Sequence, residues 1–208
     1  MKVKVCGITS LEDALICEAC GADALGFIFY RESKRYIKPE AAKEIIKSLS
    51  PFTMKVGVFV DEPIEGINLI ASEIKFNAIQ LSGNESPEYS SKIILPVIKG
   101  FRIKADFDFS IIKRYKNTAY LLDAFSSEEF GGTGKKFNWN LIPAHLKNKI
   151  ILAGGVSVDN IENIYTEIKP AAVDLSSSLE KASGIKDKEK VVNFFKKFNS
   201  LRAKETSC

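Results

Sequence analysis

Residues 1–30, MKVKVCGITSLEDALICEACGADALGFIFY, predict a strand, a helix and a second strand in that order. The apolar runs at 2–7 and 24–29 have the length of buried strands. The segment between them has helical periodicity, and Ser10 and Gly21 are placed to cap its start and its end. This order is one βαβ unit, which indicates a parallel sheet.

The same alternation continues along the chain. Six more apolar runs of strand length lie at 54–60, 78–82, 96–101, 119–124, 149–153 and 171–176. The starts of the runs are about 18 to 30 residues apart, which is the length of one βα unit. Helical patterns separate most of them; Pro39 opens one such segment, and NWNLIPAHL, the sixth connection, is the weakest.

Eight βα units in 208 residues predict an α/β fold, a single-domain (β/α)8 TIM barrel that spans residues 1–208. A doubly wound open sheet is the alternative, because a strand count does not prove closure. The last helical pattern ends near residue 201, so we expect residues 201–208 to form a frayed C-terminal tail.

The composition favours a soluble globular domain, with 45% hydrophobic and 27% charged residues. No apolar run reaches the roughly 18 residues of a membrane span, and the chain enters a strand at once without a signal-peptide pattern. We therefore expect a cytoplasmic protein with no membrane partner. The net charge of +4 is modest and lysines are mixed with acids along the predicted helices, which argues against nucleic-acid binding.

The cysteines do not suggest disulfides or a metal site. There are four, Cys6, Cys17, Cys20 and Cys208, too few and too clustered for the disulfide framework of a secreted domain. Cys17 and Cys20 form a C-x-x-C pattern inside a predicted helix, without a second pair of ligands, and His145 is the only histidine. We expect no metal site.

Polar residues at the ends of the predicted strands are the candidates for chemistry, because a barrel carries its active site on the face of the loops that follow the strands. Alternation turns Cys6 into the barrel mouth, on the same face as Lys4, and places Asp123 at the end of the sixth strand. The plainer alternatives are a small buried hydrophobe for Cys6 and an ordinary loop-start residue for Asp123.

Other inward positions lie on the fourth and eighth strands. Gln80 and Ser82 share the inward face of the fourth strand, and Asp174 and Ser176 that of the eighth. The first and eighth strands are neighbours in a closed barrel, so Lys4 and Asp174 are predicted to form a buried ion pair.

Glycine-rich stretches suggest an anion site. LAGGVS (152–157) brings Gly154 and Gly155 to a helix start, and DLSSSLE (174–180) ends the eighth strand with three serines. Barrels commonly hold phosphate at the loops after strands seven and eight. A third stretch, FGGTGKKF (130–137), is not a P-loop because Glu129 stands where glycine is required; the segment Ser126–Gly134 predicts a flexible lid instead. The alternative is that these glycines only make turns.

Eight short motifs, in this order, resemble the phosphoribosylanthranilate isomerase family. They are KVCGIT (4–9), SKRYI (33–37), VGVFVDEP (56–63), IQLSGNE (79–85), LLDA (121–124), GGTGKKFNW (131–139), LAGGV (152–156) and VDLSSSLE (173–180). The resemblance covers nearly the whole chain. It implies a (β/α)8 barrel that converts N-(5-phosphoribosyl)anthranilate into an aminoketose by Amadori rearrangement, in tryptophan biosynthesis, without cofactor or metal.

The resemblance also implies roles for matched positions. Cys6 would be the general base that removes the C2 proton of the sugar, Asp123 the general acid for the furanose ring oxygen, and Arg35 the contact for the anthranilate carboxylate. Phosphate would be held by Gly154, Gly155 and Ser176, Ser177 and Ser178, with the lid residues Gly132 and Gly134, while Gln80 and Asp174 would line the pocket. A thiol with an ordinary pKa of about 8.5 is mostly protonated at neutral pH, so Cys6 needs nearby positive charge, and Lys4 is the candidate.

Three positions depart from the family's usual pattern: Ser82 replaces a common histidine, Lys34 a proline and Ser178 a glycine. Related barrel enzymes fit less well. An indoleglycerol-phosphate synthase would need catalytic lysine and glutamate at inward strand ends, and the aminoaldose isomerase of histidine biosynthesis carries aspartate where this chain has Cys6. A non-catalytic phosphate-binding barrel is the remaining alternative. A monomer and a homodimer stay equally open, because Phe52, Phe194 and Phe195 suit a core or an interface.

Overall fold

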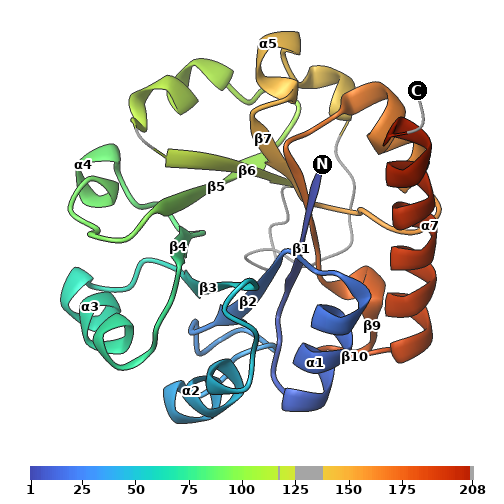
Figure 1. Ribbon diagram of the computed structural model, residues 1–208. Coiled ribbons are helices and arrows are strands. Elements are labelled where there is room, and N and C mark those ends of the chain that lie inside the picture. Colours follow the sequence, from blue (N-terminus) through green and yellow to red (C-terminus); the bar gives the residue numbers. More distant parts are fainter. Residues whose placement is uncertain (117, 125–137, 207–208) are drawn as a thin grey trace.

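The computed structural model describes residues 1–116, 118–124 and 138–206, and its eight parallel strands close into a barrel in chain order (Figure 1). The strands are β1 (Lys2–Cys6), β2 (Ala24–Ile28), β3 (Met54–Phe59), β4 (Ala78–Leu81), β5 (Val97–Ile103), β6 (Thr118–Ala124), β7 (Ile150–Leu152) and β8 (Ala172–Leu175). Strand β1 pairs with both β2 and β8. The predicted (β/α)8 barrel is therefore confirmed, and the open sheet is excluded.

Helices surround the barrel on its outer side (Figure 1). They are α1 (Leu11–Cys20), α2 (Pro39–Lys47), α3 (Ile64–Glu73), α4 (Pro87–Ser90), α5 (Ala144–Lys147), α6 (Ile161–Asn163) and α7 (Lys188–Thr206). Short 3₁₀ turns lie at Phe109–Arg114, Trp139–Leu141 and Ser177–Leu179, and a π-helical turn follows α6 at Ile164–Ile168. The structure describes no helix that is both long and apolar enough to cross a membrane.

The predicted helix boundaries agree with the local chemistry. The Ser10 side chain accepts a hydrogen bond from the Asp13 backbone N–H at 3.1 Å, and Gly21 ends α1 with a φ of 104°. Pro39 stands in the first turn of α2. The weak pattern NWNLIPAHL forms only one 3₁₀ turn and the four-residue helix α5.

The C-terminal helix corrects the prediction of a frayed tail from residue 201, because α7 continues to Thr206. Leu201 is buried in the core, and Arg202 Nη2 donates to the Met1 carbonyl at 2.7 Å and to Asp23 at 3.1 Å. These contacts fasten the last turns of the helix to the N-terminal end of the barrel. Phe194 and Phe195, which suited a core or an interface equally, are core residues.

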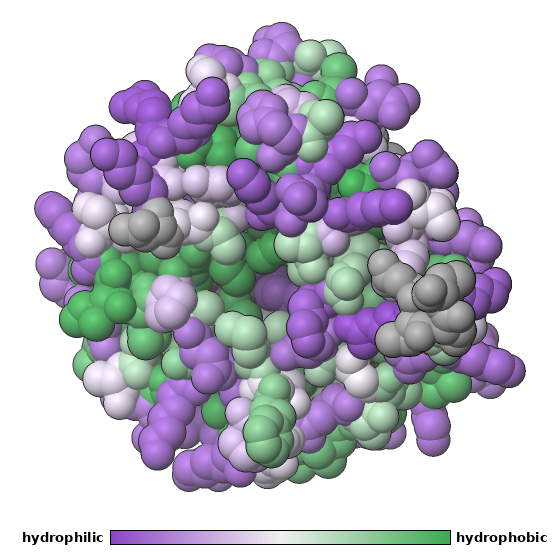
Figure 2. Space-filling view, turned by 45° about the horizontal axis from the view of Figure 1, so that its top comes forward, coloured by the Kyte–Doolittle hydropathy of each residue, from purple (hydrophilic) through white to green (hydrophobic). Residues whose placement is uncertain are grey.

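The barrel wall separates two apolar layers. The inner layer is small: Cys6, Ala24, Val56, Val58, Ala78, Ile98, Leu121 and Ala153 pack inside the barrel. The outer layer is much larger and joins strand residues such as Val5 and Phe27 to the helices. This alternation places Cys6 and its inward neighbours on the predicted face. Figure 2 shows hydrophilic side chains over much of one outer face, with apolar side chains between them.

A small hairpin between β8 and α7 had no counterpart in the predicted elements. Its strands β9 (Glu180–Ala182) and β10 (Ile185–Lys186) pair antiparallel outside the barrel sheet. Thr9, which follows the end of β1, donates its hydroxyl to the carbonyl of Gly184 at the hairpin turn. The hairpin therefore lies against the loop that follows the first strand.

Candidate active site

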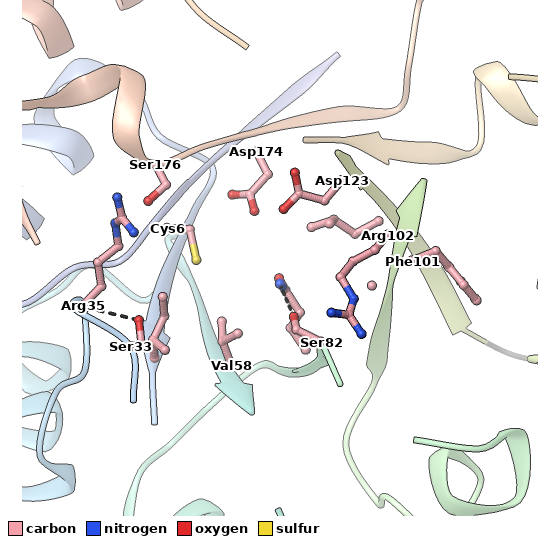
Figure 3. A pocket seen from close by; sticks show the side chains of 14 residues that line it. Cys6, Ser33, Arg35, Val58, Ser82, Phe101, Arg102, Asp123, Asp174 and Ser176 are labelled. Carbon is pink, nitrogen blue, oxygen red and sulfur yellow. Dashed lines mark hydrogen bonds between the residues drawn. The ribbon is translucent and has the colours of Figure 1, made fainter. Parts of the chain in front are cut away.

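A pocket opens where the strands end at the carboxyl face of the barrel (Figure 3). The residues that line it come from distant parts of the sequence: Cys6, Ile28, Ser33, Arg35, Val58, Gln80, Ser82, Gly100, Phe101, Arg102, Leu121, Asp123, Asp174 and Ser176. Six of the predicted site residues, Cys6, Arg35, Gln80, Asp123, Asp174 and Ser176, are thus brought together.

Cys6 ends β1 with its thiol inside the barrel, and it is 6% exposed. Gly26, on the neighbouring strand β2, makes room for it. A Cβ atom at Gly26 would lie 2.7 Å from the Cys6 sulfur, closer than real contacts allow, and 3.2 Å from Lys4 Cε, which is tighter than most real contacts. A larger residue at this point of β2 would therefore displace the thiol.

Beneath Cys6, Lys4 and Asp174 form the predicted buried ion pair. Lys4 Nζ donates to both carboxylate oxygens of Asp174 at 2.9 Å, and the two side chains are 4% and 9% exposed. Burial alone would lower the pKa of Lys4, but the attraction of Asp174 and Cys6 outweighs burial and the pKa is raised. Lys4 therefore stays cationic at neutral pH.

The ionisation of Cys6 follows from the same contacts. Burial raises the pKa of the Cys6 thiol; the charges of Lys4 and, more weakly, Lys186 lower it, whereas Asp174 raises it, and the net pKa is raised. The neutral thiol is thus the stable form in this structure, and Lys4 is the largest influence that favours the thiolate.

Asp123 is the next-to-last residue of β6 and lies beside Asp174, across the pocket from Arg35 (Figure 3). One of its carboxylate oxygens accepts the Ala124 N–H at 2.8 Å. Gly154 packs directly on this group: a Cβ atom there would lie 2.8 Å from Asp123 Oδ1 and 2.6 Å from Ala124 N. Gly154, predicted only as a phosphate contact, therefore also leaves room for the candidate acid.

Arg35 reaches the pocket from the loop after β2 and is 6% exposed. Glu180 holds one edge of its guanidinium, accepting from Nε at 2.9 and 3.1 Å and from Nη2 at 2.7 Å. Gly7, with a φ of 76°, lets the side chain pass over it, since a Cβ atom there would lie 2.6 Å from Arg35 Cδ. Glu180 was not predicted as a site residue, although it closes the VDLSSSLE motif.

The two predicted phosphate loops meet beside the pocket. A second cavity is lined by Gly154, Gly155 and Ser176–Ser178, and it shares Asp123 and Asp174 with the first. The buried hydroxyls of Ser176 and Ser178 have no hydrogen-bond partner among residues 1–116, 118–124 and 138–206. Gly132, Gly134 and the predicted lid at Ser126–Gly134 lie outside the described residues.

The wall opposite Arg35 is formed by β4 and β5 (Figure 3). Gln80 Nε2 donates to Ser82 Oγ at 3.0 Å, so the serine that departs from the family pattern contacts a predicted pocket residue. Arg102, which was not predicted as a site residue, lines this wall and donates to Asn84 Oδ1 at 3.2 Å. Alternation from the inward Ile98 through Gly100 to Arg102 is the signal that could have found it.

The C-x-x-C pattern takes no part in the site. Cys17 is buried on α1, where burial raises the pKa of its thiol to about 12. Within the described part of the chain, no three Cys, His, Asp or Glu side chains gather in a way that could hold a metal ion. These cysteines serve the packing of the helix.

The closed barrel, the thiol and carboxylate at its rim and the adjoining serine- and glycine-rich loops define a (β/α)8-barrel enzyme equipped for acid–base chemistry. The family of N-(5′-phosphoribosyl)anthranilate (PRA) isomerases matches residues 3–197. The chain belongs to this family.

Relatives and solved structures agree with this assignment. The N-(5′-phosphoribosyl)anthranilate isomerase of Geobacter sp. (strain M21) is 45% identical over 194 residues, which are 93% of this chain and 95% of that protein. The crystal structure of the Thermotoga maritima phosphoribosyl anthranilate isomerase has a TM-score of 0.88 and 39% identity, covering 96% of this chain and 99% of that one. A further structure of a phosphoribosyl anthranilate isomerase, with a TM-score of 0.85 and 38% identity over 96% of this chain and 99% of its own, is a complex with reduced 1-(o-carboxyphenylamino)-1-deoxyribulose 5-phosphate.

Proposed function

We propose that this chain isomerises N-(5′-phosphoribosyl)anthranilate to 1-(2-carboxyphenylamino)-1-deoxyribulose 5-phosphate in tryptophan biosynthesis, with Cys6 as general base and Asp123 as general acid. The observation that carries the proposal is the convergence of Cys6 and Asp123 on one pocket that adjoins two donor-rich loops. Family membership and the solved complex of a relative with a reduced form of the product support it.

The proposed steps conserve protons. Asp123 donates a proton to the furanose ring oxygen, and the ring opens to a Schiff base between C1 and the anthranilate nitrogen. The Cys6 thiolate then removes the C2 proton, and the electron pair moves toward the cationic nitrogen to give an enolamine. Transfer of a proton to C1 and loss of the C2 hydroxyl proton yield the ketone. No redox partner is required, because C1 is reduced as C2 is oxidised.

The pKa of Cys6 limits the amount of active base. Since burial raises that pKa, only a small fraction of molecules carries the thiolate at neutral pH. In this proposal Lys4 increases this fraction, as the charge that most strongly lowers the pKa of Cys6. Asp174 opposes it, because it raises the pKa of Cys6 and neutralises much of the Lys4 charge.

The substrate carries an anion at each end, and the pocket has cationic or donor groups to suit both. Phosphate would bind at Gly154, Gly155 and Ser176–Ser178, where two buried hydroxyls lack protein partners among the described residues. The anthranilate carboxylate would contact Arg35, whose planar guanidinium suits a carboxylate. Gln80 and Asp174 would line the space between.

The decisive experiment follows the fluorescence of freshly prepared phosphoribosylanthranilate. We expect the unaltered protein to consume it, and Cys6→Ser and Asp123→Asn each to lower kcat by about 10²- to 10⁴-fold, as for the loss of a general base or acid. Thermal unfolding of each variant checks that it is folded. Normal turnover by both variants would sink the mechanism, and no turnover by the unaltered protein would sink the assignment.

Location in the cytoplasm, the absence of nucleic-acid partners and a monomeric or homodimeric state also belong to the proposal. A relative from Thermotoga maritima is described as a dimeric phosphoribosylanthranilate isomerase. Phe52 is 94% exposed on the loop between α2 and β3, which leaves it available for an interface. Sedimentation of the unaltered protein over a range of concentrations distinguishes the two states.

A further inference from the structure

The hairpin of β9 and β10 supports the side of the pocket where Arg35 lies, and its first residue, Glu180, holds that arginine. We propose that Glu180 is a positioning residue, which orients the Arg35 guanidinium for the carboxylate of the substrate. The proposal rests on the proposed contact between Arg35 and the anthranilate carboxylate. It adds a residue that acts on substrate affinity through Arg35 and need not touch the substrate itself.

The contact with Glu180 fixes both the position and the plane of the Arg35 guanidinium. Both carboxylate oxygens of Glu180 accept from Nε, at 2.9 and 3.1 Å, and the second also accepts from Nη2 at 2.7 Å. The side chains of Arg35 and Glu180 are only 7% and 4% exposed. Because the pair is buried and aligned, Arg35 is already held in one rotamer before the substrate binds. Binding therefore costs less side-chain entropy than it would with a free arginine.

Glu180 is itself held by a second buried cation. Lys186 Nζ, on a side chain 1% exposed, donates to Glu180 Oε1 at 2.8 Å and to the Cys6 carbonyl at 2.7 Å. Two cations therefore share one carboxylate. Burial raises the pKa of Glu180, but Arg35 and Lys186 lower it more, so the carboxylate stays ionised.

The backbone of the hairpin is held by α1, by the loop after β1 and by α7. Asp13 Oδ2, on α1, accepts the Lys186 N–H at 3.1 Å, and Thr9 donates its hydroxyl to the Gly184 carbonyl. Lys190 Nζ donates to the Glu180 carbonyl at 2.7 Å. Glu180 is thus presented by a rigid element, as a residue that orients a binding group must be.

The experiment compares two ligands by calorimetry: reduced 1-(o-carboxyphenylamino)-1-deoxyribulose 5-phosphate and the same compound without its ring carboxylate. The ratio of their Kd values measures the preference for the carboxylate. We expect Arg35→Met to abolish this preference and Glu180→Gln to reduce it about tenfold, as when a charge-assisted hydrogen bond loses its alignment. The Kd of the carboxylate-free ligand should stay the same, which a general loss of structure would not allow.

Two further variants keep the test decisive. Lys190→Met is the matched control, because it removes a contact to the same hairpin without touching the Glu180 carboxylate, and it should retain the full preference. If Glu180→Gln does not fold, Glu180→Gln with Lys186→Gln removes the carboxylate together with one of its two buried cations and should show the same loss. An undiminished preference in a folded Glu180 variant, with the preference lost in Arg35→Met, overturns this inference alone. A preference that survives Arg35→Met overturns the proposed role of Arg35, and this inference with it.

Discussion

Two buried lysines on opposite faces of the barrel wall form similar ion pairs in different surroundings. Lys4, on β1, points into the barrel and lies 2.9 Å from Asp174; Lys99, on β5, points into the outer layer and lies 2.9 Å from Glu85. Both lysines are 3% exposed. The pKa of Lys4 is raised, whereas burial lowers the pKa of Lys99 more than Glu85 raises it.

The difference lies in what else each lysine contacts. Lys99 Nζ also donates to the carbonyls of Gly83 and Gly100, at 2.8 and 3.1 Å, and Glu85 accepts backbone N–H groups from Asp61 and Gly83. This pair organises the loop after β4. The charge of Lys4 acts on Cys6 instead. In the proposed mechanism Lys4 therefore acts on the chemistry of the site, whereas the Lys99–Glu85 pair organises the fold, although the groups are of the same kind.

The variants Lys4→Met and Lys99→Met test the contrast between the two ion pairs and should have the largest effects. Each variant leaves a buried carboxylate without its partner, so each should lower the free energy of unfolding by about 3 to 5 kcal/mol. Only Lys4→Met should also lower kcat per folded molecule, by about tenfold, because loss of the cation raises the pKa of Cys6 further and leaves fewer molecules with the thiolate. Urea unfolding and the turnover assay, both at a temperature where the variants are folded, measure the two effects. Equal activity per folded molecule in both variants would contradict the contrast.

A smaller effect is expected at two glycines on opposite faces of neighbouring strands. A Cβ atom at Gly26 would lie 2.7 Å from the Cys6 sulfur, whereas one at Gly57 would lie 3.0 Å from the rings of Phe59 and Phe76. Gly26→Ala and Gly57→Ala should each destabilise the protein by about 1 to 3 kcal/mol through overpacking. Gly26→Ala should also lower kcat because it displaces the thiol. A normal kcat in folded Gly26→Ala would show that the position of the thiol is less critical than the contact implies.

The fold and the inner face of the site could be predicted because both depend on local patterns. Spaced apolar runs set the order of strands and helices, and alternation alone turned Cys6, Asp123 and Asp174 toward one another. The Lys4–Asp174 pair followed from closure of the barrel, which makes β1 and β8 neighbours.

The support of Arg35 could not be predicted in the same way. Glu180 and Arg35 are 145 positions apart, and Lys186 is 180 positions from the Cys6 carbonyl that it contacts. From the sequence alone, each lysine and glutamate of the hairpin segment would be expected on the solvent-exposed surface. Their burial depends on the hairpin packing over the loop after β1, a tertiary arrangement that no local period encodes.

The smallest effect is expected at a third ion pair, between Lys2 and Asp23, which is more exposed than the other two; Lys2 lies on the same strand as Lys4. Lys2, 72% exposed, lies 2.7 Å from Asp23, which also accepts the Val3 N–H and a hydrogen bond from Arg202. Burial raises the pKa of Asp23, but Lys2, the Val3 N–H and Arg202 lower it more, so the net pKa is below its ordinary value of 3.8. A carboxylate with a lowered pKa stabilises the fold above its unfolded-state pKa, and this contribution is lost as the pH falls through the folded-state pKa. Asp23→Asn should therefore lower the free energy of unfolding by about 1 kcal/mol at pH 7. The difference in this free energy between the variant and the unaltered protein should shrink as the pH falls below about 4. Urea unfolding between pH 3 and pH 7 measures this; a difference that does not change with pH would show that the Asp23 contacts act through shape and not through charge.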